Sequence, residues 1–250
     1  MTLRSAVTAG VAAIVVVSWA SYGWAQQAPS GPPKGLSGSA GFGLSFTQGN
    51  TDTLVVNATD DSIYDPKTGN VMKWNLLYLR GKQNHVLTVN RFSATFRDEK
   101  TLTTRMYVFG QIDTLHDTFK QIDYLIAPAG GIGYKVLDTM RTQLTADAGV
   151  GAVVEQDAGV PARGSVAVTL SEKLVHQLTE TTTLKQMAAA LLKANDWSDG
   201  LYVFQAGIAA KISTRFQLAV DVLDTFKNKP IDPTLKQNDV ALVISIVAKY

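Results

Sequence analysis

The chain has 250 residues, 23 of them basic and 21 acidic, and its formal net charge at pH 7 is only +2. Nucleic-acid binding relies on a dominant positive field, so this near-balance excludes a nucleic-acid partner. Cysteine is absent, which excludes structural disulfides, thiolate catalysis and cysteine metal sites. The Gly- and Ser-rich stretch at 35–45 has a strand period and lacks the lysine of a phosphate-binding loop, and we expect no cofactor.

Residues 1–25 have the pattern of a cleaved secretory signal peptide. Arg4 precedes an apolar run at 7–19, and residues 23–25 form a small-x-Ala cleavage pattern. An uncleaved transmembrane anchor is the weaker alternative, because the uninterrupted apolar core is shorter than the roughly 20 residues that span a bilayer. Residues 26–34 are rich in proline and glycine, which predicts a flexible periplasmic lead-in.

From residue 35 to residue 250, apolar and polar residues alternate in short runs that are separated by turn residues. Pro128 lacks an N–H group, so we expect a bulge or an irregular stretch around it. Residues 181–193 also fit a helical period, although their context favours a strand. The expected strands are 36–47, 53–65, 71–80, 86–96, 101–115, 121–134, 143–155, 165–173, 181–193, 201–211, 215–224 and 239–250.

These runs predict an all-β fold, a transmembrane antiparallel up-and-down β-barrel in residues 35–250. No segment after the signal peptide approaches the length of a transmembrane helix, and among strand structures only a closed barrel satisfies every backbone group in lipid. We expect about 12 strands, with 10 possible if one pair is merged. The two longest connections, 155–164 and 225–237, fall at the same end, as in bacterial outer-membrane barrels. A soluble periplasmic β-protein is the alternative fold.

The last strand ends on an aromatic residue and has apolar residues at alternate positions. This pattern is typical of the C-terminal signal by which outer-membrane barrels are recognised for assembly in Gram-negative bacteria. We therefore expect the barrel-assembly machinery as a partner, lipid around the barrel, and a location in the bacterial outer membrane. The residues of this predicted assembly signal are Leu242, Ile244, Ile246, Ala248 and Tyr250.

The polar parity of the strands carries charges of both signs, which predicts a charged lumen. Such side chains either fill a medium barrel with ion pairs, which we favour, or line a narrow channel. Roughly eight strands leave a filled lumen and about 16 to 18 leave an aqueous pore, so about twelve fall between. The candidate lumen-lining residues are Arg91, Arg105, Asp123, Asp147, Lys173, Lys185, Lys211, Arg215, Asp221 and Asp239.

A catalytic site is the weakest hypothesis for this sequence. His116 with Asp113 and Asp117 is the nearest approach to an acid–base cluster, and a hydrolase or acyltransferase site at a barrel rim could be built from such groups. No serine stands in a recognisable nucleophile elbow. We expect that the protein is not an enzyme.

Three segments of turn residues, taken in their order and spacing, resemble one known family. They are 49–53, 131–134, and 227–230 followed by Asn238 and Asp239. They are similar to the salt-induced outer-membrane protein family, a bacterial family of barrels with a domain of unknown function. The resemblance implies a barrel and a compartment but no reaction. The expected function is a structural or permeability-related role under envelope or osmotic stress, with a narrow porin-like channel for small solutes as the alternative.

Overall fold

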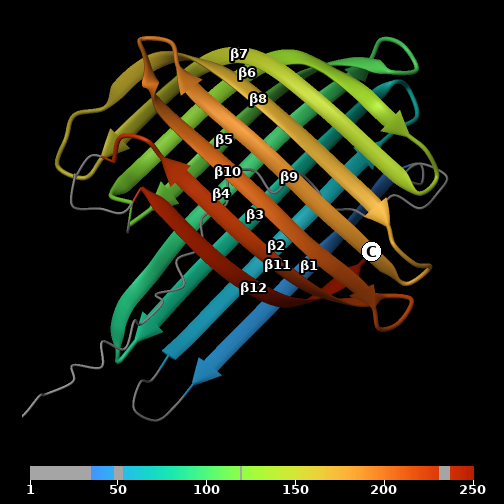
Figure 1. The fold of residues 1–250 in the computed structure, drawn as a ribbon, viewed down its shortest axis with the longest axis horizontal. Coiled ribbons are helices and arrows are strands. Elements are labelled where there is room, and N and C mark those ends of the chain that lie inside the picture. The colour runs from blue at the N-terminus through green and yellow to red at the C-terminus, as the bar shows by residue number, and fades with distance from the viewer. Residues whose placement is uncertain (1–34, 48–52, 119, 231–236) are drawn as a thin grey trace, which may run out of the picture.

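The structure, a computed structural model, describes residues 35–47, 53–118, 120–230 and 237–250. The predicted signal peptide and lead-in lie outside the described residues. Within the described part, twelve antiparallel strands form one closed barrel (Figure 1), which confirms the predicted fold class and excludes the ten-strand version. No helix among these residues has the length and apolar character to cross a membrane.

Each strand pairs with the next in the chain, and the last pairs with the first. We call the end where β1 begins and β12 ends the chain-end rim, and the opposite end the loop-end rim. The segment open to a helical interpretation is a strand, β9. The strands are β1 (Gly35–Thr47), β2 (Thr53–Asp65), β3 (Asn70–Gln83), β4 (Val86–Thr101), β5 (Met106–Asp117), β6 (Ile122–Asp138), β7 (Thr142–Asp157), β8 (Arg163–Gln177), β9 (Thr182–Lys193), β10 (Asp196–Lys211), β11 (Phe216–Lys227) and β12 (Asn238–Lys249).

The outer wall of the barrel is apolar because the apolar parity of each strand points outward. Large hydrophobic side chains are exposed on every strand except β9; Leu44 on β1 and Ile244 on β12, for example, are 62% and 54% exposed. The outward positions of β9 include the smaller Ala188 and Ala190. An apolar belt that encircles a β-barrel is the surface that a bilayer requires.

Pro128 interrupts a ladder as the sequence predicts. It lies opposite Ile112 of β5, but the β6–β7 ladder has no pairs at Ala127 and Pro128 and resumes at Ala129↔Gly151 in unchanged register. The missing N–H of proline explains the gap. The register shifts of β6 are found instead near its two ends, so the irregular stretch is confirmed and no bulge forms at the proline.

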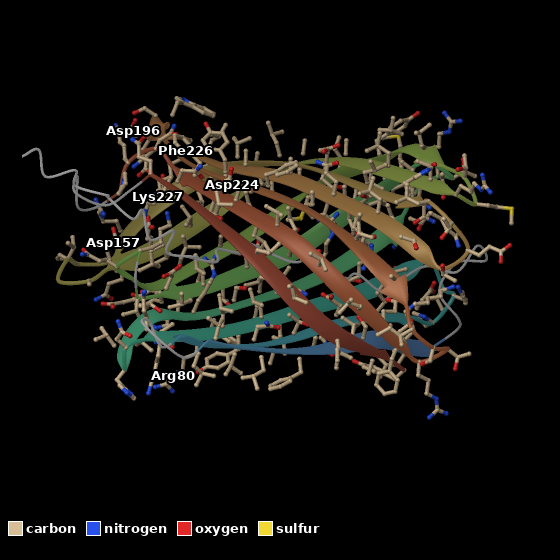
Figure 2. All side chains as sticks on the ribbon, turned by 60° about the horizontal axis from the view of Figure 1, so that its bottom comes forward. Arg80, Asp157, Asp196, Asp224, Phe226 and Lys227 are labelled. Carbon is tan, nitrogen blue, oxygen red and sulfur yellow. The ribbon has the colours of Figure 1, made fainter. Side chains whose placement is uncertain are left out.

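The seam between β1 and β12 is held at the chain-end rim. Gly38 and Tyr250 exchange two backbone hydrogen bonds of 3.0 and 3.1 Å, and the ladder continues to Phe42↔Ile246. Beyond that pair the two strands diverge toward the loop-end rim (Figures 1 and 2, blue and dark red). The barrel is therefore closed by a short ladder, and we expect contacts near Tyr250 to contribute strongly to the stability of this seam.

The side chain of Tyr250 crosses β1 and reaches β2. Its hydroxyl donates to Asp60 Oδ1 at 2.8 Å and lies 2.6 Å from the hydroxyl oxygen of Ser62. The crossing needs a glycine at position 38, because a Cβ there would lie 2.8 Å from the tyrosine ring. Tyr250 thus connects the last strand directly to the second.

Replacing Tyr250 with phenylalanine is expected to lower the free energy of unfolding by about 1.5–3 kcal/mol, because a hydrogen bond to a carboxylate is lost and Asp60 loses a donor. Denaturant unfolding of purified protein refolded in lipid vesicles measures this without the assembly machinery. Tyr134→Phe is the control, since within the described part of the chain the Tyr134 hydroxyl accepts a single long bond, 3.5 Å, from exposed Arg105. Equal stability of the two variants would contradict a closing role for the Tyr250 hydroxyl.

Candidate functional site

The lumen near the chain-end rim is organised around Arg97 of β4, which is only 2% exposed. Its guanidinium donates to Glu99 Oε1 at 2.7 Å and to Gln111 Oε1 at 2.8 Å, and it lies 3.2 Å from Asp147 Oδ2. Its Cζ atom is 3.8 Å from the centre of the Phe109 ring. One planar cation therefore joins side chains of β4, β5 and β7.

Further hydrogen bonds extend this chain-end network to more strands. The Tyr107 hydroxyl donates to Asp147 Oδ1 at 2.7 Å, and Ser171 of β8 donates to Asp147 Oδ2 at 3.2 Å. On the other side, Lys73 of β3 donates to Glu99 at 2.7 Å. Members of the network thus come from five strands, β3, β4, β5, β7 and β8, and they project into the lumen at this level.

A second network fills the lumen near the loop-end rim. Glu155 of β7 accepts hydrogen bonds of 2.6 Å from both Lys227 of β11 and Lys193 of β9. Three strands, β8 to β10, lie between β7 and β11 in the barrel, so the Lys227 bond spans the lumen rather than a neighbouring pair. Asp157 is paired with Arg163 at 2.6 Å, and Figure 2 shows Asp157 and Lys227 at this end.

Between the two charged networks part of the inward surface is apolar, and we call these apolar side chains the apolar layer. Polar side chains, among them Ser93, Thr95 and Gln111, are also buried between the networks on β4 and β5. Along β9 the inward positions run from Lys185 through Met187 and Leu191 to Lys193, so the apolar layer lies between charges. The layer has two clusters. One comprises Leu115, Ile122, Leu125, Ala127, Val153, Ala167, Met187, Leu191, Leu201 and Val203, and the other comprises Leu79, Val89, Leu223 and Val243 with Val55.

Small cavities lie among the inward side chains, and one of ≈ 30 Å³ borders Phe109, Gln111 and Asp113. A cavity of ≈ 70 Å³ remains beside Asp61, Lys185 and Asp221. That volume has room for only a few water molecules, since each needs roughly 10–15 Å³ by this measure. Paired charges and apolar side chains thus project into the lumen from the strands themselves.

Half of the candidate lumen residues lie inside the barrel. Arg91 is fully buried and paired with Asp117 at 3.0 Å. The inward group is Arg91, Asp147, Lys173, Lys185 and Asp221.

Four candidates lie at the rims instead, and the side chain of Asp239 lies outside the described part of the chain. Arg105 and Arg215 are exposed in turns, and Lys211 ends β10 with its amine bonded to the Glu180 carbonyl at 3.1 Å. Asp123 is exposed at the register shift that begins β6. The physical reason is the same in each case: near a turn or a register shift, strand parity no longer fixes the direction of a side chain.

Several network members were missing from the candidate residues. Lys227 and Asp157 lie beyond the predicted ends of their strands, at 224 and 155. Lys193 and Glu99 had no assigned role. Continuing the inward parity from Leu223 to Lys227 was the signal available in the sequence, whereas pairing across the lumen was not.

The residues considered for acid–base chemistry do not come together. Asp113 and Asp117 are buried inside the barrel, where Asp113 accepts from Thr95 at 2.7 Å and Asp117 pairs with Arg91. His116 has the opposite parity, and its Nδ1 lies 2.8 Å from the Asp123 carbonyl oxygen. Among the described residues there is also no group of three or more His, Asp or Glu side chains that could hold a metal ion.

Comparisons with known proteins give a family and a set of solved barrels. No curated protein matches the chain. The family model described as "Protein of unknown function, DUF481" matches residues 40–250. Similar structures include a NanC porin, at 8% identity and TM-score 0.48, covering 86% of this chain and 97% of its own. The translocator domain of the autotransporter NalP from Neisseria meningitidis has 12% identity and TM-score 0.48, with coverage of 90% and 91%. The toluene transporter TodX from Pseudomonas putida has 9% identity and TM-score 0.40, with coverage of 87% and 89%.

Proposed function

We propose, from the premise that the chain belongs to the DUF481 family of unknown function, that it is an outer-membrane barrel with a filled lumen and a structural role in the cell envelope. The observation that carries this proposal is the apolar layer held between two buried charge networks. The encircling belt of exposed apolar side chains supports the membrane location. In this proposal the signal peptide exports the chain, and the assembly machinery recognises the C-terminal strand.

A filled barrel is suited to envelope or osmotic stress for a physical reason. It adds a rigid, hydrogen-bonded element to the membrane without adding a path for ions. The resemblance of the sequence to salt-induced outer-membrane proteins supports this stress-related role. We further propose that the protein is not an enzyme, because His116 faces away from the buried carboxylates.

A narrow passive channel for small solutes is the second candidate. The cavity beside Asp61, Lys185 and Asp221 favours it, since polar groups of both signs surround a space inside the barrel. Conduction would require the apolar layer to move, because Val153 and Met187 are each only 1% exposed.

Thiol accessibility tests the filled lumen in a chain that has no cysteine of its own. Val153→Cys places a thiol of similar size in the apolar layer, and Met140→Cys places one at a position that is 74% exposed in a chain-end turn. In folded protein, a small charged thiol reagent should modify the Val153 variant roughly 100-fold or more slowly than the Met140 variant, because access needs local opening. Similar rates would favour the channel.

A further inference from the structure

A pocket of ≈ 540 Å³ at β9 is lined by inward residues such as Asp147 and Ser171 and, on the outer wall, by side chains of β8 to β11; we call its outer-wall part the groove. Its floor includes the small side chains Ala188 and Ala190, at the one strand that exposes no large hydrophobic residue. Larger side chains of the neighbouring strands form its sides, among them Leu170, Tyr202, Phe204 and Phe226. The rings of Tyr202 and Phe226 lie 6.0 Å apart. The apolar outer wall therefore has a depression at β9, and aromatic side chains form one side of it.

The groove also contains Asp224 of β11, a carboxylate with one unsatisfied oxygen among the described residues. Its parity is outward, because Leu223 and Thr225 on either side are buried in the lumen. The Oδ1 atom of Asp224 is buried and has no hydrogen-bond partner among the described residues. By contrast, Glu172, the other outward carboxylate of the groove, accepts a hydrogen bond from Gln186. A charged group in apolar surroundings is costly unless a donor meets it.

The same outer wall offers a complementary cation on another face. Arg80 of β3 has outward parity and is exposed, and no ion pair or hydrogen bond involves it among the described residues. Arg80 and Asp224 each lie three residues before the loop-end terminus of their strands, Gln83 and Lys227. Figure 2 shows both toward that end. Within one barrel β2, β1 and β12 separate β3 from β11, so Arg80 and Asp224 of the same copy are too far apart to pair.

We propose that the groove receives Arg80 of a second copy of this chain. A membrane gives all copies the same orientation, so opposite charges that lie toward the same rim on different faces come together when barrels pack side by side. A guanidinium suits this groove, because it pairs with a carboxylate and stacks on aromatic rings. Groove and arginine are different patches, so the contact is heterologous and builds a ring if it closes.

An amine-bearing lipid would supply a donor to Asp224 as well, but it would leave Arg80 unexplained. A second copy satisfies both groups in one contact. The inference rests on the membrane location proposed above and is independent of whether the lumen is filled.

Exchanging the charges of Asp224 and Arg80 tests the proposal. The full mature chain is studied in mild detergent and in lipid nanodiscs, and native mass spectrometry measures the number of copies in each complex. Wild type should form oligomers, and Asp224→Arg and Arg80→Asp should each weaken association by about tenfold or more, since like charges then meet. The double variant should restore association. Asp138→Asn, an exposed acid at the opposite rim, should leave association unchanged.

Three outcomes would overturn the inference: a folded wild type that stays monomeric, oligomers that neither single variant weakens, or single-variant losses that the double variant does not restore. A monomer that retains phosphatidylethanolamine only while Asp224 is present would identify a lipid as the occupant instead. Heat-modifiable gel mobility of each variant confirms a folded barrel. Failure of the membrane location appears separately, as protein that stays in solution without detergent.

Discussion

Replacing Arg97 with alanine is expected to lower the free energy of unfolding by about 3–5 kcal/mol, because it removes one partner of a buried ionic network. Glu99 and Asp147 would keep their charges inside the barrel with fewer donors. The remaining donors replace Arg97 only in part: Lys73 donates to Glu99 and the Tyr107 hydroxyl donates to Asp147, each at 2.7 Å. Denaturant unfolding of the refolded protein in vesicles measures the change.

Two variants make the Arg97 result specific. Arg105→Ala removes an exposed arginine whose side chain makes a single 3.5 Å hydrogen bond among the described residues, and it should change stability by no more than about 0.5 kcal/mol. Arg97→Lys keeps the charge but loses the planar fork, and it should fall between the two. If the Arg97 and Arg105 alanine variants were equally stable, the chain-end network would not hold the barrel together.

Replacing both Met187 and Leu191 with serine is expected to turn a silent barrel into a conducting one. Both side chains belong to the apolar layer, at 1% and 4% exposure. Their loss opens space, and the hydroxyl groups allow water to occupy it, since an apolar cavity of that size stays dry. Each large-to-small change costs about 2–5 kcal/mol of stability, so folding has to be confirmed first by heat-modifiable mobility. Planar-bilayer recordings then measure discrete conductance steps.

The matched control changes the same strand on its other face. Ala188→Ser with Ala190→Ser adds two hydroxyl groups to β9 on the outer wall, and conductance should stay absent. Steps from the control, or silence from the folded Met187/Leu191 variant, would show that the apolar layer is not the barrier.

The strands were predictable because lipid constrains one face of each of them. Outward positions have to be apolar along most of each strand. Because outward and inward positions alternate, this requirement produces a hydrophobic period of two in segments such as 36–47 and 239–250. The ends were less predictable. Thr101 begins a strand in the sequence interpretation but ends β4 in the structure, because a turn at 102–105 follows it.

The lumen was predictable in character but not in its pairings. Inward parity points to Arg91 and Asp147, which lie inside the barrel, yet parity gives no information about which strands face each other across it. The Glu155–Lys227 pair joins residues 72 positions apart, on strands that share no ladder. The Tyr250–Asp60 bond likewise depends on barrel closure, because it joins the two ends of the sheet over Gly38.

Planar-bilayer conductance of the wild-type mature chain tests the central claim most directly. Once heat-modifiable gel mobility shows a closed barrel, the account predicts no discrete steps, because the apolar layer and the two charge networks fill the lumen. Regular steps from folded wild type, altered by Asp147→Asn, would contradict the account and place the protein among channels.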